Sequence, residues 1–323
     1  MKFEPWISFP TFLLILGFSS CIPPINGIPP DPRSFSGKHS DILQVGMSLP
    51  YFIDYTRAME KLNLSDTMQD AGPFTFFIPN AHAFAVFLNR NNISDITGLP
   101  PDLAKNLLLN HIIRGRFLLL NLSTGYYPSL ATETTTGNNL DLYLQNDGLF
   151  ELNGTLCMGT PDIPADNGMI HSITAMIPLP TVADHISVND DFSLLHDILE
   201  RRDLSISYDS LLRSDGPFTL FAPDNEAFTA CLGLHQAWPS VNDIPARDLS
   251  LLMDRLLIST KNILLKNITS DSLLVSRGSD TLHIGYSHKT WIIQGPEHGQ
   301  AKILTHDIQA VNGVIQEVDC VWF

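Results

Sequence analysis

The sequence predicts an α+β fold, built as two globular domains of similar size in tandem. The first observation is a repeated string, because GPFTFFIPNAHAF at residues 72–84 returns as GPFTLFAPDNEAF at residues 216–228. The second is a nearly constant offset, since Gly72 and Gly216 lie 144 positions apart (216 − 72), and Gly168 and Gly313, in two further matching strings, lie 145 positions apart (313 − 168). The third is that apolar segments with helical spacing precede short strand-like segments in both halves. A period of about 145 residues is the size of one ordinary domain rather than of a solenoid repeat.

Each copy of the repeated string predicts a buried strand followed by the start of a helix. Gly-Pro turns the chain, a bulky apolar run follows at residues 74–78 or 218–222, and a proline ends the run. Side chains able to accept hydrogen bonds from a first helical turn come next, namely Asn80, Asp224 and Asn225. Glu226 suits the positive end of the helix dipole. We therefore expect a structural role for these residues.

The remaining elements follow from apolar periodicity and from turns rich in Gly, Asn and Asp. In the first half the pattern predicts helices over residues 49–62 and 103–113, and strands over 117–122, 140–144, 149–152 and 169–177. In the second half it predicts helices over residues 192–199 and 249–258, and strands over 273–275, 281–286, 291–294 and 314–321.

The repeated blocks resemble the fasciclin-like (FAS1) domain family. Its members carry a G-P-[FY]-T-x-F-A-P block and end on N-G-[VM]-I, which this chain has as DNGMIHSI at residues 166–173 and VNGVIQEV at residues 311–318. The second block fits closely, whereas the first departs at Ile78, Ala81 and His82. The resemblance implies a tandem pair of FAS1-like domains, each a β-sandwich or wedge with helices packed at one side.

The two domains are expected at residues 40–180, called the first repeat, and residues 185–323, called the second repeat. Each contains one whole copy of the repeated pattern, so each is expected to fold independently. Pro178-Leu179-Pro180 marks the junction, where we expect an exposed linker that proteases cut first.

Residues 1–27 predict a secretory signal peptide and the beginning of a proline-rich leader. Lys2 precedes an apolar segment at 11–18, and small serines follow it. The apolar segment is shorter than the roughly 20 residues that span a bilayer. A lipoprotein anchor at Cys21 is an alternative that the preceding residues fit poorly. We therefore expect a secreted, extracellular protein with no transmembrane segment.

The formal net charge of −15 narrows the classes of partner. Binding to nucleic acid or to anionic membranes needs clustered Lys and Arg, which release counterions and steer the encounter. The sequence therefore predicts neither nucleic acid nor a polyanion as the main partner.

Five N-x-S/T triplets predict a glycoprotein, with acceptors at Asn63, Asn92, Asn121, Asn153 and Asn267. Asn153-Gly154 lies between two strand-like segments and predicts a hairpin turn, with Asn153 at an exposed tip. Asn121 follows an apolar run, so we expect it to be partly buried.

No catalytic, cofactor or metal site is predicted. The chain has no nucleophile elbow, phosphate-binding loop or H-E-x-x-H triplet, and its histidines lack the spacing of a zinc site. Beyond the leader it has three cysteines, Cys157, Cys231 and Cys320. A bond between Cys231 and Cys320 and buried free thiols are both compatible with the sequence.

The resemblance implies a non-enzymatic protein for cell adhesion or matrix interaction, whose partners are matrix proteins or cell-surface receptors of the integrin kind. A soluble protein that holds an apolar molecule or a metabolite in a domain pocket is the alternative. Some FAS1 domains use an Asp-Ile pair and a Tyr-His motif in integrin recognition. The positions that match are Asp162, Ile163, Asp307, Ile308 and His111, the last preceded by Asn110 instead of Tyr. A carboxylate beside an exposed Ile could meet a receptor-bound cation, and the alternative is that Asp caps a turn while Ile lies in the core.

Overall fold

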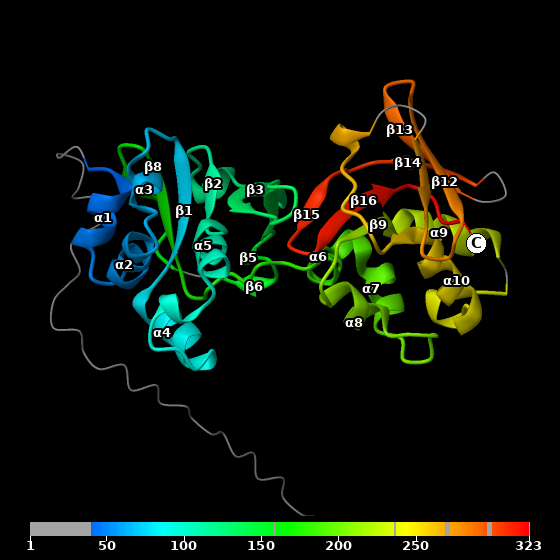
Figure 1. Ribbon diagram of the computed structural model, residues 1–323, viewed down its shortest axis with the longest axis horizontal. Helices are drawn as coiled ribbons and strands as arrows, with labels where there is room; N and C mark the ends of the chain where they lie inside the picture. Colours follow the sequence, from blue (N-terminus) through cyan, green and yellow to red (C-terminus); the bar gives the residue numbers. More distant parts are fainter. Residues whose placement is uncertain (1–39, 158, 236, 269–271, 296–298, 323) are drawn as a thin grey trace, which may run out of the picture. The chain divides into compact units, whose positions relative to one another are not determined.

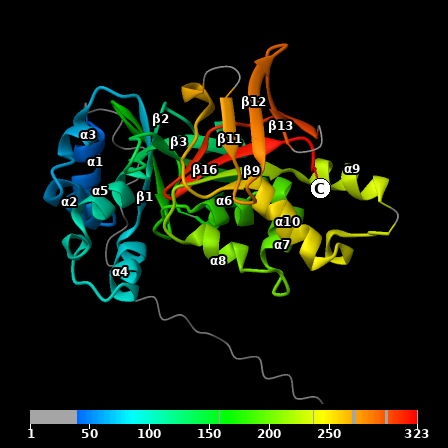
Figure 2. The same ribbon diagram turned by 45° about the vertical axis from the view of Figure 1, so that its right-hand side comes forward.

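The computed structural model describes residues 40–322 except 158, 236, 269–271 and 296–298 (Figure 1). The predicted signal peptide and leader at residues 1–27 lie outside the described residues. Within them, each repeat consists of helices beside a sheet, as the turned view also shows (Figure 2). The α+β class predicted from the sequence is confirmed.

The first repeat begins with helices and ends with strands. Its helices are α1 (Ile42–Ser48), α2 (Ile53–Lys61), α3 (Ser65–Gln69), α4 (Ala81–Arg90) and α5 (Pro101–Leu109), with 3₁₀ turns η2 (Ile96–Gly98) and η3 (Leu119–Asn121). Its strands are β1 (Phe74–Pro79), β2 (Ile112–Arg114), β3 (Gly125–Thr132), β4 (Asn139–Asn146), β5 (Phe150–Leu152), β6 (Thr155–Leu156), β7 (Ile163–Ala165) and β8 (Gly168–Ile173).

The second repeat has the same order of elements. Its helices are α6 (Val182–Val188), α7 (Ser193–Leu199), α8 (Tyr208–Arg213), α9 (Asn225–Leu234) and α10 (Ala246–Leu256), with 3₁₀ turns η4 (Asp190–Phe192), η5 (Val241–Asp243) and η6 (Leu265–Asn267). Its strands are β9 (Phe218–Pro223), β10 (Leu257–Ile258), β11 (Ser272–Val275), β12 (Thr281–Ser287), β13 (Thr290–Gln294), β14 (Gln300–Ile303), β15 (Ile308–Ala310) and β16 (Gly313–Val318).

The repeated string forms an interior strand of each sheet, β1 or β9, called here the central strand. The first sheet has the order β6-β5-β4-β3-β2-β1-β8-β7, and in the second β9 lies between β10 and β16. The pairs β1·β8 and β9·β16 are parallel and keep the same register, because Phe74 pairs with Gly168 and Phe218 pairs with Gly313. All six residues of β1 and of β9 are buried, which explains why both copies are apolar except at Thr75 and Thr219 instead of alternating.

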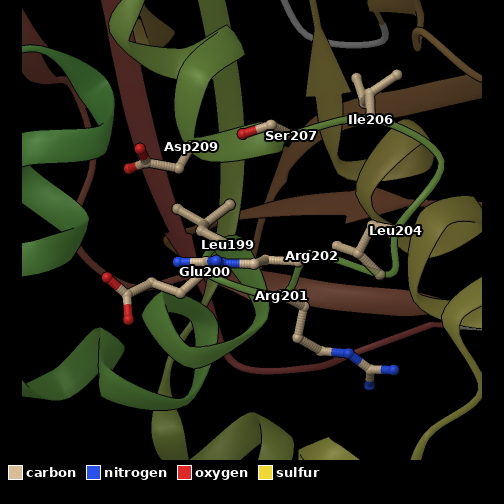
Figure 3. Close-up of a pocket in the computed structure, with 8 residues that line it drawn as sticks. All are labelled: Leu199, Glu200, Arg201, Arg202, Leu204, Ile206, Ser207 and Asp209. Atoms are coloured by element: carbon tan, nitrogen blue, oxygen red, sulfur yellow. The ribbon is translucent and has the colours of Figure 1, made fainter.

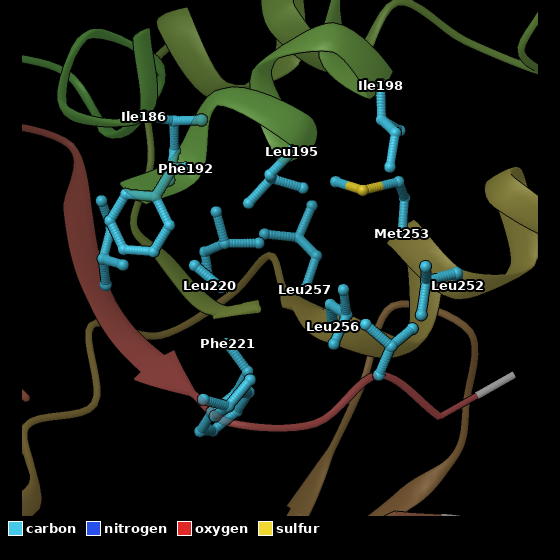
Figure 4. Packing of buried hydrophobic residues seen from close by; sticks show 14 of the residues in the cluster. Ile186, Phe192, Leu195, Ile198, Leu220, Phe221, Leu252, Met253, Leu256 and Leu257 are labelled. Carbon is cyan, nitrogen blue, oxygen red and sulfur yellow. The ribbon is translucent and has the colours of Figure 1, made fainter. Parts of the chain in front are cut away.

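Side chains from helices and sheet interlock beneath each central strand. In the second repeat, Leu195 and Ile198 of α7 point toward Leu220 of β9 and Met253 of α10 (Figure 4). These four side chains are fully buried. Burying one side chain of this size contributes about 2 kcal/mol, so the helices are held to the sheet mainly by this layer.

One asparagine in each repeat joins three separate segments. The Asn167 amide nitrogen donates to the carbonyls of Met68 and Asp70, both at 2.8 Å, and its oxygen accepts the Ile42 N–H at 2.9 Å. In the second repeat Asn312 makes the matching three bonds, to Leu212, Ser214 and Val182. The first helix, the turn before the central strand and the last strand are thereby fixed to one another.

The predicted helix starts are confirmed with one change. Asn80 accepts the Ala83 N–H at 2.9 Å and Asp224 accepts the Ala227 N–H at 2.7 Å, so both are N-caps. Asn225 is instead the first helical residue, and its side-chain oxygen accepts the Leu194 N–H at 2.9 Å. The second asparagine therefore ties α9 to α7 rather than capping its own helix.

Several predicted boundaries were wrong. Residues 117–122 were expected to form a strand, but they form a loop that contains η3. The helix expected over 49–62 starts only at Ile53, and the one expected over 103–113 ends at Leu109, after which β2 begins. In both helices the apolar pattern continues past the helix because the neighbouring segment is also buried.

The junction between the repeats is hydrogen-bonded to both of them, and of Pro178-Leu179-Pro180 only Pro178 is exposed. The Pro178 carbonyl accepts hydrogen bonds from the side chains of Asn110 and Asn153, and the Pro180 carbonyl accepts the Val311 N–H at 2.9 Å. Both repeats therefore hold this segment, and we no longer expect proteases to cut it first.

The two repeats also contact each other through the outer face of β3 and β4. Asp141 on β4 is buried, and its carboxylate accepts the backbone N–H of Gln309 on β15 at 2.7 Å. Tyr143 donates its hydroxyl proton to the Asn189 side chain at 3.2 Å, and the Tyr126 ring lies 5.3 Å from the ring of His185. This face of the first repeat is thus covered by the second.

Replacing Asn312 by Ala is expected to destabilise the second repeat. Three buried hydrogen bonds are lost, each with a net value near 1 kcal/mol, so the free energy of unfolding should fall by roughly 3 kcal/mol. Urea denaturation of the full chain measures the change, with the exposed Asn242→Ala as control. A loss no larger than that of the control would show that the amide does not hold the repeat together.

Candidate functional site

Asp162 and Asp307 occupy the same tight turn in the two repeats. Both have positive φ angles, 58° and 62°, which Asp tolerates better than most residues. Asp162 Oδ1 accepts the Leu119 N–H at 2.8 Å, and Asp307 Oδ1 accepts the Leu265 N–H at 2.7 Å. Each carboxylate thereby fixes the start of a 3₁₀ turn that lies far from it in sequence.

A second side chain supports each of these aspartates. The Asp162 N–H donates to Nδ1 of His171 at 3.1 Å, while Nε2 of the same ring lies 3.1 Å from the Phe117 carbonyl, so the neutral ring carries its proton on Nε2. Burial lowers the pKa of His171, and the nearby Asp162 charge only partly opposes this.

In the second repeat Gln316 replaces the histidine and makes the same pattern of bonds. Its oxygen accepts the Asp307 N–H at 2.9 Å, and its amide nitrogen donates to the Ile263 carbonyl at 3.0 Å. We call the two loops held in this way, residues 117–122 and residues 263–268, the aspartate-held loops. An amide and a neutral imidazole are interchangeable here because each offers one acceptor and one donor.

The apolar members of the candidate set are not at the surface. Ile163 is 0% exposed and Ile308 is 2% exposed, so the structure contradicts the exposed contact expected for them. His111 is fully buried as well, with Nδ1 at 2.8 Å from the Leu107 carbonyl and Nε2 accepting the Ile177 N–H at 3.0 Å. Its burial lowers the pKa to about 4, so the ring is neutral at physiological pH.

Four of the five glycan acceptors, Asn63, Asn92, Asn121 and Asn267, are exposed. Asn153 forms the predicted hairpin turn between β5 and β6, but the expected exposed tip is wrong. Its side chain is only 8% exposed, accepts the Tyr143 N–H at 2.8 Å and donates to the Pro178 carbonyl at 3.2 Å. Asn121, expected to be partly buried, is in fact exposed.

A pocket of about 550 Å³ lies at the loop between α7 and α8 (Figure 3). Its lining includes the charged residues Glu200, Arg202 and Asp209. The Arg201 guanidinium is directed away from Asp209 and bonds the Asp203 carboxylate at 2.7 Å and the Ile244 carbonyl at 2.8 Å. A rim of this character suits water better than an apolar molecule.

The structure also shows where possible metal ligands and the three cysteines lie. Among the described residues, no group of three or more His, Cys, Asp or Glu side chains is placed to hold a metal ion. Cys157, Cys231 and Cys320 are free thiols, and burial raises the pKa of each. None of the helices in the described part of the chain has the length and hydropathy needed to cross a bilayer.

Comparison with known proteins gives matches over both repeats. The Fasciclin domain model matches residues 50–180 and 190–322. The chain is 27% identical over 276 residues to transforming growth factor-beta-induced protein ig-h3 of Sus scrofa, which covers 82% of this chain and 36% of that protein. It is 32% identical over 183 residues to human periostin, covering 53% of this chain and 20% of periostin. The chain thus spans about a third or less of these two relatives.

A bacterial relative and a solved structure complete the comparison. The uncharacterized protein sll1735 of Synechocystis is 32% identical over 140 residues, which are 42% of this chain and 96% of that protein. A FAS1 domain pair from the insect cell adhesion molecule Fasciclin I has a similar fold, with a TM-score of 0.51 and 16% sequence identity. That similarity covers 85% of this chain and 97% of the insect pair.

Glycan occupancy should follow exposure. In a eukaryotic host we expect glycans on Asn63, Asn92, Asn121 and Asn267 and none on Asn153, whose amide is engaged in the fold. Enzymatic deglycosylation followed by peptide mass mapping measures each site. A glycan on Asn153 would contradict the buried position, and no mass shift at all would contradict export through a glycosylating pathway.

The buried His111 should make the first repeat sensitive to acid. Its pKa of about 4 in the folded state is below the 6.5 of the unfolded chain, so between these values the unfolded state binds more protons. Stability is therefore lost as the pH falls from 6.5 to 4, by at most about 3 kcal/mol from this residue. Urea denaturation across this range should show a smaller decline in His111→Gln than in the wild type.

The exposed His82→Gln serves as the control and should decline as the wild type does. Asp141, whose burial raises its pKa to about 7, acts in the opposite direction but is common to all three proteins. Equal declines in the wild type and His111→Gln would show that the ring is not kept neutral by the fold.

Proposed function

This chain belongs to the Fasciclin domain family, and from that membership we propose that it is a secreted, non-enzymatic protein for cell adhesion or matrix interaction. The observation that carries the proposal is the match of both repeats to the family, together with a fold shared with a domain pair of an insect cell adhesion molecule. Secretion is supported by the leader sequence, and the exposed glycan acceptors are compatible with it. The partners we propose are matrix proteins or cell-surface receptors.

Within that function, we assign Asp162 and Asp307 to positioning rather than to direct contact. Each carboxylate already accepts the N–H of Leu119 or Leu265, which leaves it less free to ligate a receptor-bound cation. Their side chains are 36% and 16% exposed, so neither stands out from the surface. The exposed parts of the aspartate-held loops are better placed to meet a partner than the aspartates themselves.

Attachment of cells to the immobilised chain tests both the adhesion function and the positioning role of Asp162 and Asp307. We expect cells to attach, and a matched pair of substitutions at Asp162 and Asp307 to separate the two roles. Asn keeps an oxygen that accepts the loop N–H, so the double Asn variant should attach as the wild type does. The double Ala variant releases the loops and should lose attachment.

Circular dichroism of each variant shows whether the fold is kept. Loss of attachment in the folded Asn variant would mean that the charge itself meets the partner and that the positioning role is wrong. If the wild type supports no attachment and a native mass spectrum shows a retained small molecule, the ligand-binding alternative replaces the adhesion proposal.

A further inference from the structure

The second repeat leaves bare a sheet face whose counterpart in the first repeat is covered in part. In the first repeat Asp141 of β4 lies opposite Pro128 of β3, and the second repeat covers Asp141 while Pro128 is exposed. In the second repeat His283 of β12 lies opposite Leu273 of β11, in the matching position. There Leu273 and Val275 are each 62% exposed. We call this surface of β11 and β12 the bare sheet face.

The match between these strands rests on their core residues. Leu140 and Leu142 flank Asp141 and are buried, just as Leu282 and Ile284 flank His283 and are buried. Because side chains alternate along a strand, Asp141 and His283 occupy the same outward position in their repeats. The second repeat covers Asp141 in the first repeat, whereas His283 is exposed.

The first repeat in turn leaves bare a loop that corresponds to one part of the second repeat's contact surface. The second repeat reaches the first with its aspartate-held loop, where Lys266 donates to the Asn138 side chain at 2.6 Å. The corresponding residue of the first repeat is Leu120, since both follow the leucine whose N–H the aspartate accepts. Leu120 is 92% exposed and Leu118 is 44% exposed. We call this loop, residues 117–122, the bare leucine loop.

The hydrogen bond between Gln309 and Asp141, one of the polar bonds between the two repeats, has no counterpart on the two bare surfaces. The carboxylate of Asp141 corresponds to His283, and the N–H of Gln309 corresponds to Pro164, which has none. At this pair of positions a contact between the bare surfaces would therefore bury neither an unpaired carboxylate nor an unpaired backbone N–H. Buried unpaired polar groups are a main cost of a new interface, and the imidazole of His283 is the polar group that the contact covers here.

We propose that the bare leucine loop of one chain binds the bare sheet face of a second copy. The contact repeats between chains the arrangement that already joins the two repeats within one chain. It brings the loop that carries Leu120 to the strand pair that carries Leu273 and Val275, so that exposed apolar side chains on both surfaces are removed from water. Because the two surfaces differ, the association is head to tail and propagates into chains wherever it does not close into a ring.

Charge and glycosylation set the conditions for this contact. A net charge of −15 makes copies repel, so association should strengthen as salt screens the repulsion. Asn121 is next to Leu120 and exposed, so a glycan there would cover the bare leucine loop. The test therefore uses the chain produced in a bacterial host, which adds no N-linked glycan, at moderate salt.

Sedimentation velocity over a concentration series measures the association. The wild-type mass should rise well above the 35.8 kDa of one chain, and Leu120→Asp or Leu273→Asp should each remain a monomer. Leu234→Asp is the matched control, because Leu234 is 82% exposed but lies at the end of α9, and it should associate as the wild type does. All three positions are exposed, so the substitutions should leave the fold intact.

A mixture of the Leu120→Asp and Leu273→Asp variants tests whether the association is head to tail. The Leu120→Asp chain keeps its sheet face and the Leu273→Asp chain keeps its leucine loop, so one contact can form between them. The mixture should give dimers of one chain of each kind and no larger species. The proposal is overturned if the wild type stays monomeric at all concentrations, if the variants associate as the control does, or if the mixture forms no dimer.

Discussion

Each repeat depends on one asparagine amide that holds three distant segments at one point. Asn167 and Asn312 fix the first helix and the turn before the central strand to the start of the last strand. The glycine after each asparagine is required by the same geometry, because a Cβ on Gly168 or Gly313 would lie 2.2 or 2.5 Å from the carbonyl oxygen of the neighbouring central strand. The parallel strand pair, and through it the rest of the sheet, is aligned by this point.

The parts of the fold that could be predicted from sequence are those set by local chemistry. A proline-bounded apolar run followed by Asn80 or Asp224 predicted a strand and a helix cap, and both copies form them. Residues 117–122 have the composition of a strand, but Asp162, 43 residues away, captures the Leu119 N–H and turns the segment into a loop. A bond over that separation leaves no local pattern in the sequence.

The candidate site shows the same division between local and distant causes. The Asp-Ile pairs were assigned from their resemblance to a motif of some FAS1 domains, yet their presence in both repeats indicates what the fold needs, and Ile163 and Ile308 are core residues. The hairpin at Asn153 was predicted from Asn-Gly, whereas its burial depends on the Pro178 carbonyl. Asp141 gave no signal, since a carboxylate in an outward strand position is usually solvated and only the second repeat makes it a buried acceptor.

Asp162 and Asp307 fix the position of the aspartate-held loops without restricting which side chains these loops carry. The bond from Asp162 or Asp307 goes to a backbone N–H, so it holds the loop in place regardless of the side chains that the loop carries. This is why Leu120 and Lys266 can occupy corresponding positions, each in a 3₁₀ turn, although one side chain is apolar and the other is charged. Such a frame lets the binding preference of a repeat diverge by substitutions in the loop alone, at little cost in stability, so that duplicated domains can acquire different neighbours without being refolded.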